Sequence, residues 1–225
     1  DHGDPDVYTE IELTATDASG VSAKTSINIY LNNNISADGN MVQNGSLETI
    51  DLLDPTKPHL WNKSKWGTNT AVFTYPVAGY AGANLRAAQI DVSGYVSGDA
   101  KWSFDPTYVI PNTSYTFRSV YKATATTRIV AAIVLQDGTV VYQDIVENLP
   151  ASASWVQNQY AFVTPPFARS VSIYHVIEAN GTLTIDDYSL MLSSAVPPPS
   201  TNLIVNPSLE VAVGALPQAW ASNKW

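Results

Sequence analysis

Residues 114–146 read SYTFRSVYKATATTRIVAAIVLQDGTVVYQDIV. In the first part of this stretch, Tyr115, Phe117 and Tyr121 fall on one face of an extended chain and Arg118 falls on the other. The apolar run RIVAAIVL follows, then the turn residues QDG, and then a second β-rich run, TVVYQDIV. Alternation with a period of two, interrupted by turn residues, is typical of antiparallel strands. The stretch therefore predicts three successive β-strands.

The same pattern extends from about residue 40 to residue 193. Further β runs are AVFTYPV, LRAAQIDV, DAKWSFDP, WVQNQYAFVTP, SVSIYHVI and GTLTIDDYSLML. In DAKWSFDP, alternation places Trp102 and Phe104 on one face and Lys101 and Ser103 on the other. No long segment keeps an apolar period of 3.6 residues, and charged residues make up only 14%, well below the usual quarter or so. The predicted fold class is all-β, an antiparallel sandwich of two sheets.

Composition and motifs exclude several functions. A net charge of −9, with no Lys/Arg cluster, argues against binding to nucleic acid. No apolar run approaches the roughly 20 residues that a membrane-spanning helix needs. The absence of cysteine excludes disulfides, thiolate nucleophiles and Cys-based zinc sites. No catalytic motif surrounds Asp51 and Asp54, which lie in a Pro-rich turn region, so we predict that the chain is not an enzyme.

One part of the sequence occurs twice. NMVQNGSLE (Asn40–Glu48) returns as NLIVNPSLE (Asn202–Glu210), and WNKSKW (Trp61–Trp66) returns as WASNKW (Trp220–Trp225). Gly45 corresponds to Pro207, and because Pro cannot take a positive φ, the turn does not require a left-handed residue at this position.

The repeat and the composition divide the chain into four segments. Residues 40–193 are one complete module, 194–201 (SAVPPPST) are a Pro-rich linker, and 202–225 are the truncated start of a second module. Residues 1–34 contain two alternating runs around Asp17-Ala18-Ser19-Gly20, which predicts a β-hairpin. This hairpin resembles the last two strands of an Ig-like domain of the PKD or cadherin-like kind, and the resemblance implies that the rest of that domain lies upstream.

Five motifs occur in order in the complete module: NMVQNGSLE, PHLWNKSKWG, YTFRSVYKA after PNTS, ASWVQNQYAFVTP and LTIDDYSLML. Together they resemble the jelly-roll carbohydrate-binding modules of the group that includes families 4, 9, 16 and 22. The resemblance implies a jelly-roll β-sandwich whose opening and closing motifs meet, commonly around a structural calcium ion.

Calcium binds carboxylate and carbonyl oxygens. The resemblance assigns the carboxylates to Glu48 and to Asp187, or to Asp186 in its place, and the carbonyls to the turn that contains Asn44 and Ser46. The alternative is that Glu48 is a solvated residue at a strand end, and that the two aspartates protect an edge strand against aggregation.

A sugar-binding site needs aromatic planes for the apolar face of the sugar ring and polar groups for its hydroxyls. Candidates for these two roles are Trp61, Trp66, Trp102, Tyr121, Tyr174 and His175, with Arg118, Gln136 and Gln159 as polar partners. The core is the alternative for several of them. Trp102 is as consistent with the core as with a site, His175 follows an apolar alternation, and Trp155 matches a position that packs inside such modules. Trp61 and Trp66 lie in a stretch with the composition of an exposed loop.

We therefore predict non-catalytic polysaccharide binding within a larger exported protein, located outside the cell or on the surface of a bacterium or archaeon. The alternative is a structural or adhesive β-sandwich repeat of a surface stalk, without a sugar site. Unpaired strand edges at both ends of the chain also predict strand pairing between subunits.

Overall fold

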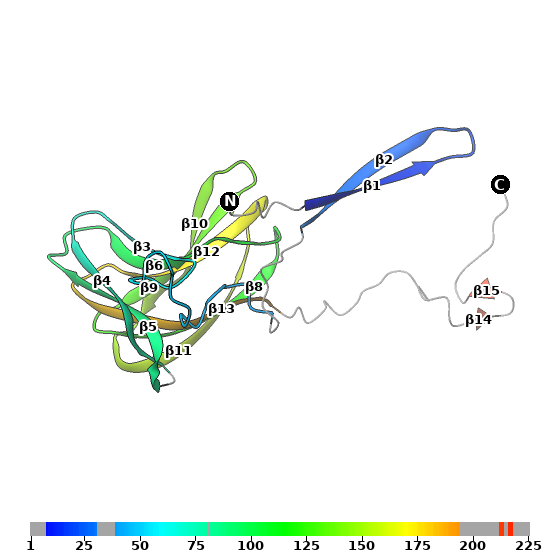
Figure 1. The fold of residues 1–225 in the computed structure, drawn as a ribbon. Helices are drawn as coiled ribbons and strands as arrows, with labels where there is room; N and C mark the ends of the chain where they lie inside the picture. Colours follow the sequence, from blue (N-terminus) through cyan, green and yellow to red (C-terminus); the bar gives the residue numbers. More distant parts are fainter. Residues whose placement is uncertain (1–7, 31–38, 81, 194–211, 214–215, 218–225) are drawn as a thin grey trace. The chain divides into compact units, whose positions relative to one another are not determined.

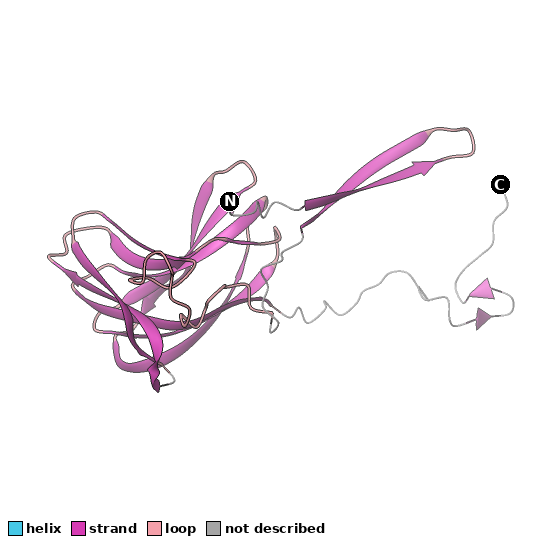
Figure 2. Ribbon diagram, in the orientation of Figure 1, coloured by secondary structure: helices cyan, strands magenta, loops and turns pink. Residues whose placement is uncertain are grey.

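The computed structural model describes residues 8–30, 39–80, 82–193, 212–213 and 216–217. Every regular element in these ranges is a strand, so they contain no helix that could cross a membrane (Figure 2). The chain forms two compact units, Asp1–Ser193 and Ser194–Trp225. The all-β prediction is confirmed.

The sandwich is built from two antiparallel sheets, which form two layers (Figure 1). One sheet, which we call the front sheet, has the strand order β10-β9-β12-β6-β3, and β7 pairs with β12. Its strands are β3 (Trp61–Trp66), β6 (Asp99–Phe104), β7 (Thr107–Tyr108), β9 (Thr127–Leu135), β10 (Val140–Leu149) and β12 (Ala168–Ile177). The back sheet has the order β11-β8-β13-β5-β4. Its strands are β4 (Thr70–Gly79), β5 (Gly82–Ser93), β8 (Ser114–Ala123), β11 (Ser152–Val163) and β13 (Gly181–Leu192).

The core lies between the two sheets and follows the predicted alternation. Tyr115, Phe117 and Tyr121 of β8 are buried, and Arg118 is exposed. In β6, Trp102 is also fully buried. Because side chains alternate between the two faces of a strand, each sheet has a second face that points away from the core. These two outer faces carry the surface grooves of the sandwich.

The prediction of a loop at residues 61–66 was wrong. This segment is the edge strand β3, and it pairs with β6 from Trp61↔Phe104 to Trp66↔Asp99. Its side chains are mostly polar, as is common for edge strands, so the sequence resembled a loop. Trp61 and Trp66 are an odd number of positions apart and therefore point to opposite faces of the sheet.

The opening and closing motifs of the module meet in the structure. The Met41 N–H donates to the Leu190 carbonyl at 2.9 Å, and the Tyr188 N–H donates to the Gly45 carbonyl at 2.9 Å. Gly45 does not have a positive φ, as its alignment with Pro207 predicted. A Cβ atom at Gly45 would instead overlap the Tyr188 carbonyl oxygen. Glycine is needed here because the two backbones approach closely.

Strands β1 (Tyr8–Thr16) and β2 (Ser22–Tyr30) form the predicted hairpin. In its turn, Asp17 Oδ1 accepts hydrogen bonds from the N–H groups of Ser19 and Val21. The assignment of the hairpin to an Ig-like domain stays a prediction. In the second unit the structure describes only β14 (Ala212–Val213), paired with β15 (Leu216–Pro217). The rest of the predicted second module, and the linker, lie outside the described residues.

Candidate functional site

A groove of about 380 Å³ crosses the outer face of the front sheet. We call it the aromatic groove. It receives side chains from all five strands of the sheet order: Tyr142 and Asp144 of β10, Arg128 and Val130 of β9, Tyr174 and Val176 of β12, Asp99 and Lys101 of β6, and Trp66 of β3. Their sequence neighbours Ile129, Ala131, His175 and Trp102 point into the core. The groove is therefore a direct product of the strand alternation.

Trp66 forms one end of the aromatic groove, and 61% of its surface is exposed. Its indole Nε1–H donates to Asp99 Oδ2 at 2.7 Å, which fixes the orientation of the ring. Asp99 is buried and also accepts a hydrogen bond from Lys101 Nζ at 2.5 Å. The close backbone contact between Gly98 and the Trp66 carbonyl leaves no space for a Cβ atom at Gly98. The Trp66 ring is thus exposed and held in place.

Two tyrosines contribute to the same groove. Tyr142 is 70% exposed, and Tyr174 is half-buried. Lys101 Nζ lies 5.4 Å from the centre of the Tyr174 ring, within the range of a cation–π contact. Burial, together with the nearby Tyr142 and Asp99, raises the pKa of the Tyr174 hydroxyl. This hydroxyl therefore stays protonated at neutral pH and is able to donate a hydrogen bond.

The charged side chains of the aromatic groove are paired with one another. Arg128 binds Asp144 at 3.0 Å and Glu178 at 2.8 Å. Lys101 is paired with Asp99. The groove thus combines aromatic rings with charged side chains that are already paired, an arrangement that suits a ligand with an apolar ring face and many hydroxyl groups.

Four residues predicted to contact sugar are instead part of the core. Trp61, Trp102, Tyr121 and His175 are fully buried. Trp61 Nε1–H donates to the Asn44 carbonyl, and Trp102 Nε1–H donates to the Gln89 carbonyl, both at 3.1 Å. The indole N–H groups of Trp61 and Trp102 are thus satisfied inside the sandwich, and both rings are structural.

His175 shows the strongest effect of burial among these residues. It stacks edge-on against Tyr121, with ring centres 4.8 Å apart, and its Nε2 and the Thr127 hydroxyl lie 2.7 Å apart. Burial lowers the pKa of His175 to about 3, so the imidazole is neutral in the folded protein at neutral pH.

The three predicted polar partners lie away from the aromatic groove. Arg118 and Gln159 are cross-strand neighbours on the back sheet, and Gln136 is an exposed residue in the turn after β9. Trp155 is half-buried rather than part of the core, with its ring under Lys122 Nζ at 4.9 Å. Trp66 and Tyr174 are the predicted residues that do line the aromatic groove. The predictions did not include Tyr142, Asp99, Lys101 or Arg128.

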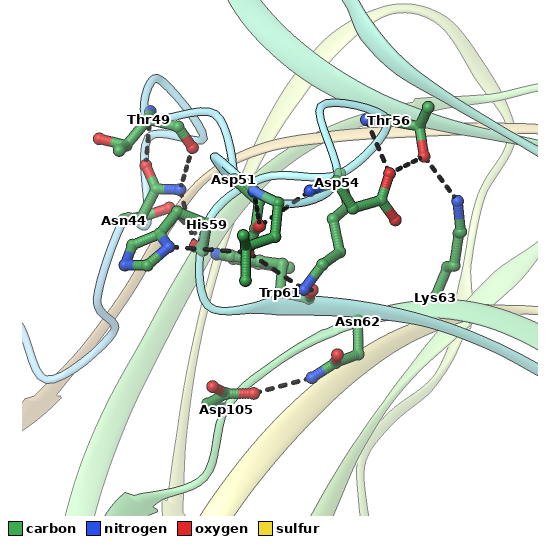
Figure 3. A network of polar contacts seen from close by, with 12 residues as sticks. Asn44, Thr49, Asp51, Asp54, Thr56, His59, Trp61, Asn62, Lys63 and Asp105 are labelled. Atoms are coloured by element: carbon green, nitrogen blue, oxygen red, sulfur yellow. Dashed lines mark hydrogen bonds and ion pairs between the residues drawn. The ribbon is translucent and has the colours of Figure 1, made fainter. Parts of the chain in front are cut away.

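The loop between the opening motif and β3 is held by polar contacts (Figure 3). The Asn44 side chain accepts from the Thr49 N–H and donates to the carbonyls of Thr49 and His59, each at 2.9 Å. Asp51 Oδ1 accepts from two backbone N–H groups farther along, and these bonds lower the pKa of Asp51 to about 2. The backbone carbonyl of Asn44, the group predicted to bind calcium, accepts hydrogen bonds from the Leu47 N–H at 3.0 Å and from Trp61 Nε1–H at 3.1 Å.

Three of the residues predicted to bind calcium are carboxylates that affect one another. Burial raises the pKa of Asp186 to about 6, with smaller contributions from Asp187 and Glu48. Burial and Glu48 also raise the pKa of Asp187. Glu48 is bound by Arg86, whose backbone N–H donates to Glu48 Oε1 at 2.7 Å. In the described part of the chain, no group of three or more His, Asp or Glu side chains is arranged to hold a metal ion.

Comparison with known proteins gives similarity of fold. No protein-family model matches the sequence, and no curated protein sequence matches it. The enzymatically active domain of tailspike protein 4 of bacteriophage CBA120 is 22% identical with a TM-score of 0.52, over 70% of this chain and 22% of that chain. The tandem CBM22-1–CBM22-2 domain of Paenibacillus barcinonensis Xyn10C is 14% identical with a TM-score of 0.50, over 71% of this chain and 48% of that chain.

The C-terminal family 22 carbohydrate-binding module of Clostridium thermocellum Xyn10B is 14% identical with a TM-score of 0.49, over 72% of this chain and 99% of that chain. The chain spans about a fifth of the tailspike structure and about half of the tandem domain. At these identities the likeness is one of fold: the chain has the jelly-roll β-sandwich seen in carbohydrate-binding modules.

Proposed function

We propose that the sandwich binds a polysaccharide chain in the aromatic groove and does not cleave it. The observation that carries this proposal is the exposed Trp66 ring, which Asp99 holds at one end of a groove that also contains Tyr142 and Tyr174. An exposed aromatic side chain fixed by a buried acceptor is ready to stack on the apolar face of a sugar ring. The similarity of fold to carbohydrate-binding modules supports the same function.

The charges of the groove support binding without catalysis. A glycosidase uses two carboxyl groups, one of which stays protonated to act as an acid. In the aromatic groove, Asp99 is paired with Lys101, and Asp144 is paired with Arg128. Both carboxylates are therefore engaged by a basic side chain, whereas a glycosidase needs two carboxyl groups free to flank the glycosidic bond. Asp186, which has a raised pKa, belongs to the back sheet and is buried.

We also place this module in a larger protein that works outside the cell or on its surface. The second copy of the opening motif at Asn202 supports an arrangement of tandem modules. Two modules on one chain bind a long polymer more tightly than either alone, because the second contact forms at high effective concentration.

Binding of the full chain to a panel of insoluble and soluble polysaccharides tests this function. We expect Trp66→Ala to weaken binding to the retained polysaccharide about tenfold or more, because a few aromatic contacts carry most of the binding free energy of such an interface. Phe167→Ala is the matched control, since Phe167 is an exposed aromatic residue outside the groove. If no polysaccharide is retained by the folded protein, or if the two variants behave alike, the proposal is wrong.

We also propose, separately, that a structural calcium ion binds at Glu48, Asp186 and Asp187. Besides burial, Asp187 and Glu48 contribute to the raised pKa of Asp186, and Glu48 contributes to that of Asp187, so a bound cation would relieve this repulsion. The three side chains would have to rearrange around the ion, since they do not form a metal site in the described structure. Arg86 already binds Glu48, so a calcium ion would have to compete with the guanidinium group. We expect calcium chloride to raise the melting temperature relative to EDTA, and Asp187→Asn to reduce that difference. Equal melting temperatures in calcium and EDTA would refute this proposal.

A further inference from the structure

A second groove, of about 470 Å³, lies on the outer face of the back sheet. We call it the polar groove. Its lining includes Arg118 of β8, Gln157 and Gln159 of β11, and Asp187 and Ser189 of β13. None of the described residues that line it is aromatic, in contrast to the aromatic groove.

Strand register brings these side chains together. Arg118 lies opposite Gln159 on one side and opposite Ser189 on the other, so three polar residues form a row across three strands. Beside this row the pairing of β13 with β8 shifts between Asp186 and Ser189, and Asp187 takes a φ of 49°. A positive φ at a residue other than glycine costs free energy, and such strain clusters at binding sites.

Several polar side chains in this groove have hydrogen-bonding groups that no described residue of the protein binds. Arg118 is exposed and has neither an ion pair nor a side-chain hydrogen bond with any described residue. The Asp187 carboxylate likewise accepts no hydrogen bond from the described residues, although its backbone N–H donates to Asp186. Gln157 is different, since its amide donates to the Tyr80 hydroxyl at 2.8 Å. In the aromatic groove, by contrast, Lys101 and Arg128 both have acidic partners.

We propose that the polar groove is a second carbohydrate site, which binds an uncharged, hydroxyl-rich sugar through hydrogen bonds. A guanidinium group is only a donor, and an ionised carboxylate is only an acceptor. An anionic ligand would be repelled by Asp187, and a cationic ligand would be repelled by Arg118. A sugar hydroxyl both donates and accepts, so neighbouring hydroxyls of one neutral ring are able to satisfy Arg118, Gln159 and Asp187 together.

The two grooves lie on the outer faces of opposite sheets, so a ligand in one does not block the other. The module would then hold two segments of polysaccharide at once, one by ring stacking and one by hydrogen bonds. This second site does not depend on the proposed function of the aromatic groove, and the two are tested separately.

The side chains of the polar groove report directly on binding. In ¹⁵N-correlated NMR spectra of the full chain, Arg118 Nε–H and the amide groups of Gln157 and Gln159 give their own signals, and Trp66 Nε1–H reports on the aromatic groove. Neutral oligosaccharides of glucose, xylose, mannose and galactose are added in EDTA, which removes any cation at Asp187. Glucuronate and glucosamine serve as the anionic and cationic probes.

We expect a neutral oligosaccharide to shift the Arg118 and Gln159 signals more than either charged probe does. Arg118→Ala and Gln159→Ala should each weaken this binding about tenfold, the effect of losing a hydrogen bond to a charged or polar group. Trp66→Ala should leave the affinity of the polar groove unchanged. Shifts at Arg118 with glucuronate alone, or no shift there with any neutral sugar, would overturn the second site. Shifts confined to Arg118 and Gln159, with none at Trp66, would support it and refute the function proposed for the aromatic groove.

Discussion

Gly45 is the point at which the two ends of the module come closest, and Gly45→Ala tests whether this contact holds the sandwich closed. The Tyr188 N–H donates to the Gly45 carbonyl at 2.9 Å, and Asn40 Nδ2 donates to the Tyr188 carbonyl at 3.0 Å. A Cβ atom at position 45 would overlap that Tyr188 carbonyl oxygen and lie 3.1 Å from Asn40 Nδ2. Two backbone segments have to separate before a methyl group fits.

The size of the effect follows from these contacts. Loss or lengthening of two hydrogen bonds costs about 1 kcal/mol each. Forcing a methyl group into a packed backbone contact costs a further 1 to 3 kcal/mol or so. Because Gly45 has a negative or extended φ, alanine adds no strain of its own there. We therefore expect Gly45→Ala to reduce the free energy of unfolding by about 3 to 5 kcal/mol.

Chemical denaturation followed by tryptophan fluorescence measures this loss. The matched control is Ser46→Ala, since Ser46 is the next residue and is exposed. The midpoint of Gly45→Ala should fall with an unchanged slope, which indicates a change in stability alone. If Gly45→Ala and Ser46→Ala differ from the wild type by the same small amount, below about 0.5 kcal/mol, the contact does not hold the module closed.

Two further predictions concern buried polar groups. Asp99→Asn leaves one acceptor oxygen for two donors, Trp66 Nε1 and Lys101 Nζ. We therefore expect about tenfold weaker binding to a polysaccharide that the wild type retains. Asp105→Asn, outside the groove, is the control, and equal affinities of the two variants would contradict the role of Asp99. Burial depresses the pKa of His175 to about 3, so the neutral imidazole contributes its full stability above about pH 6.5. As the pH falls from there toward 3, the free energy of unfolding should decrease by up to about 1.4 kcal/mol per pH unit. Unfolding measured across this range should show a shallower pH dependence for His175→Gln, and identical slopes would show that the imidazole is not buried in its neutral form.

Most of the fold was predictable because, in most strands, apolar residues alternate along the face that lies in the core. The sequence around Phe117 and Trp102 shows this pattern directly, and both residues are in the core. The strand Trp61–Trp66 was missed because an edge strand needs few apolar residues, and its Asn, Lys and Ser side chains are those of a loop. Alternation thus identifies a strand only where one of its faces is buried.

The predicted site was less accurate because aromatic residues serve both the core and a sugar site. Composition does not tell Trp61 from Trp66, but their odd separation in one strand sends the first into the core and leaves the second exposed. Recognising residues 61–66 as a strand would have placed Trp61 in the core and kept Trp66 as the candidate. His175 and Tyr121 were also misplaced, because both lie on the inner face of their strands, where an aromatic ring packs into the core.

The remaining residues of the aromatic groove were not predictable from local sequence at all. Tyr142 and Trp66 are far apart in the chain and lie on opposite edges of the front sheet, and only the order of the strands between them makes them parts of one groove. That order is set by long-range pairing, such as His175↔Ile129 and His175↔Trp102, which leaves no local pattern. The same argument applies to Arg118 and Gln159, which pair with each other on the back sheet and so lie away from Trp66 on the front sheet. Local sequence therefore identifies the residue types suited to a sugar site, and strand pairing decides which of them meet in a groove.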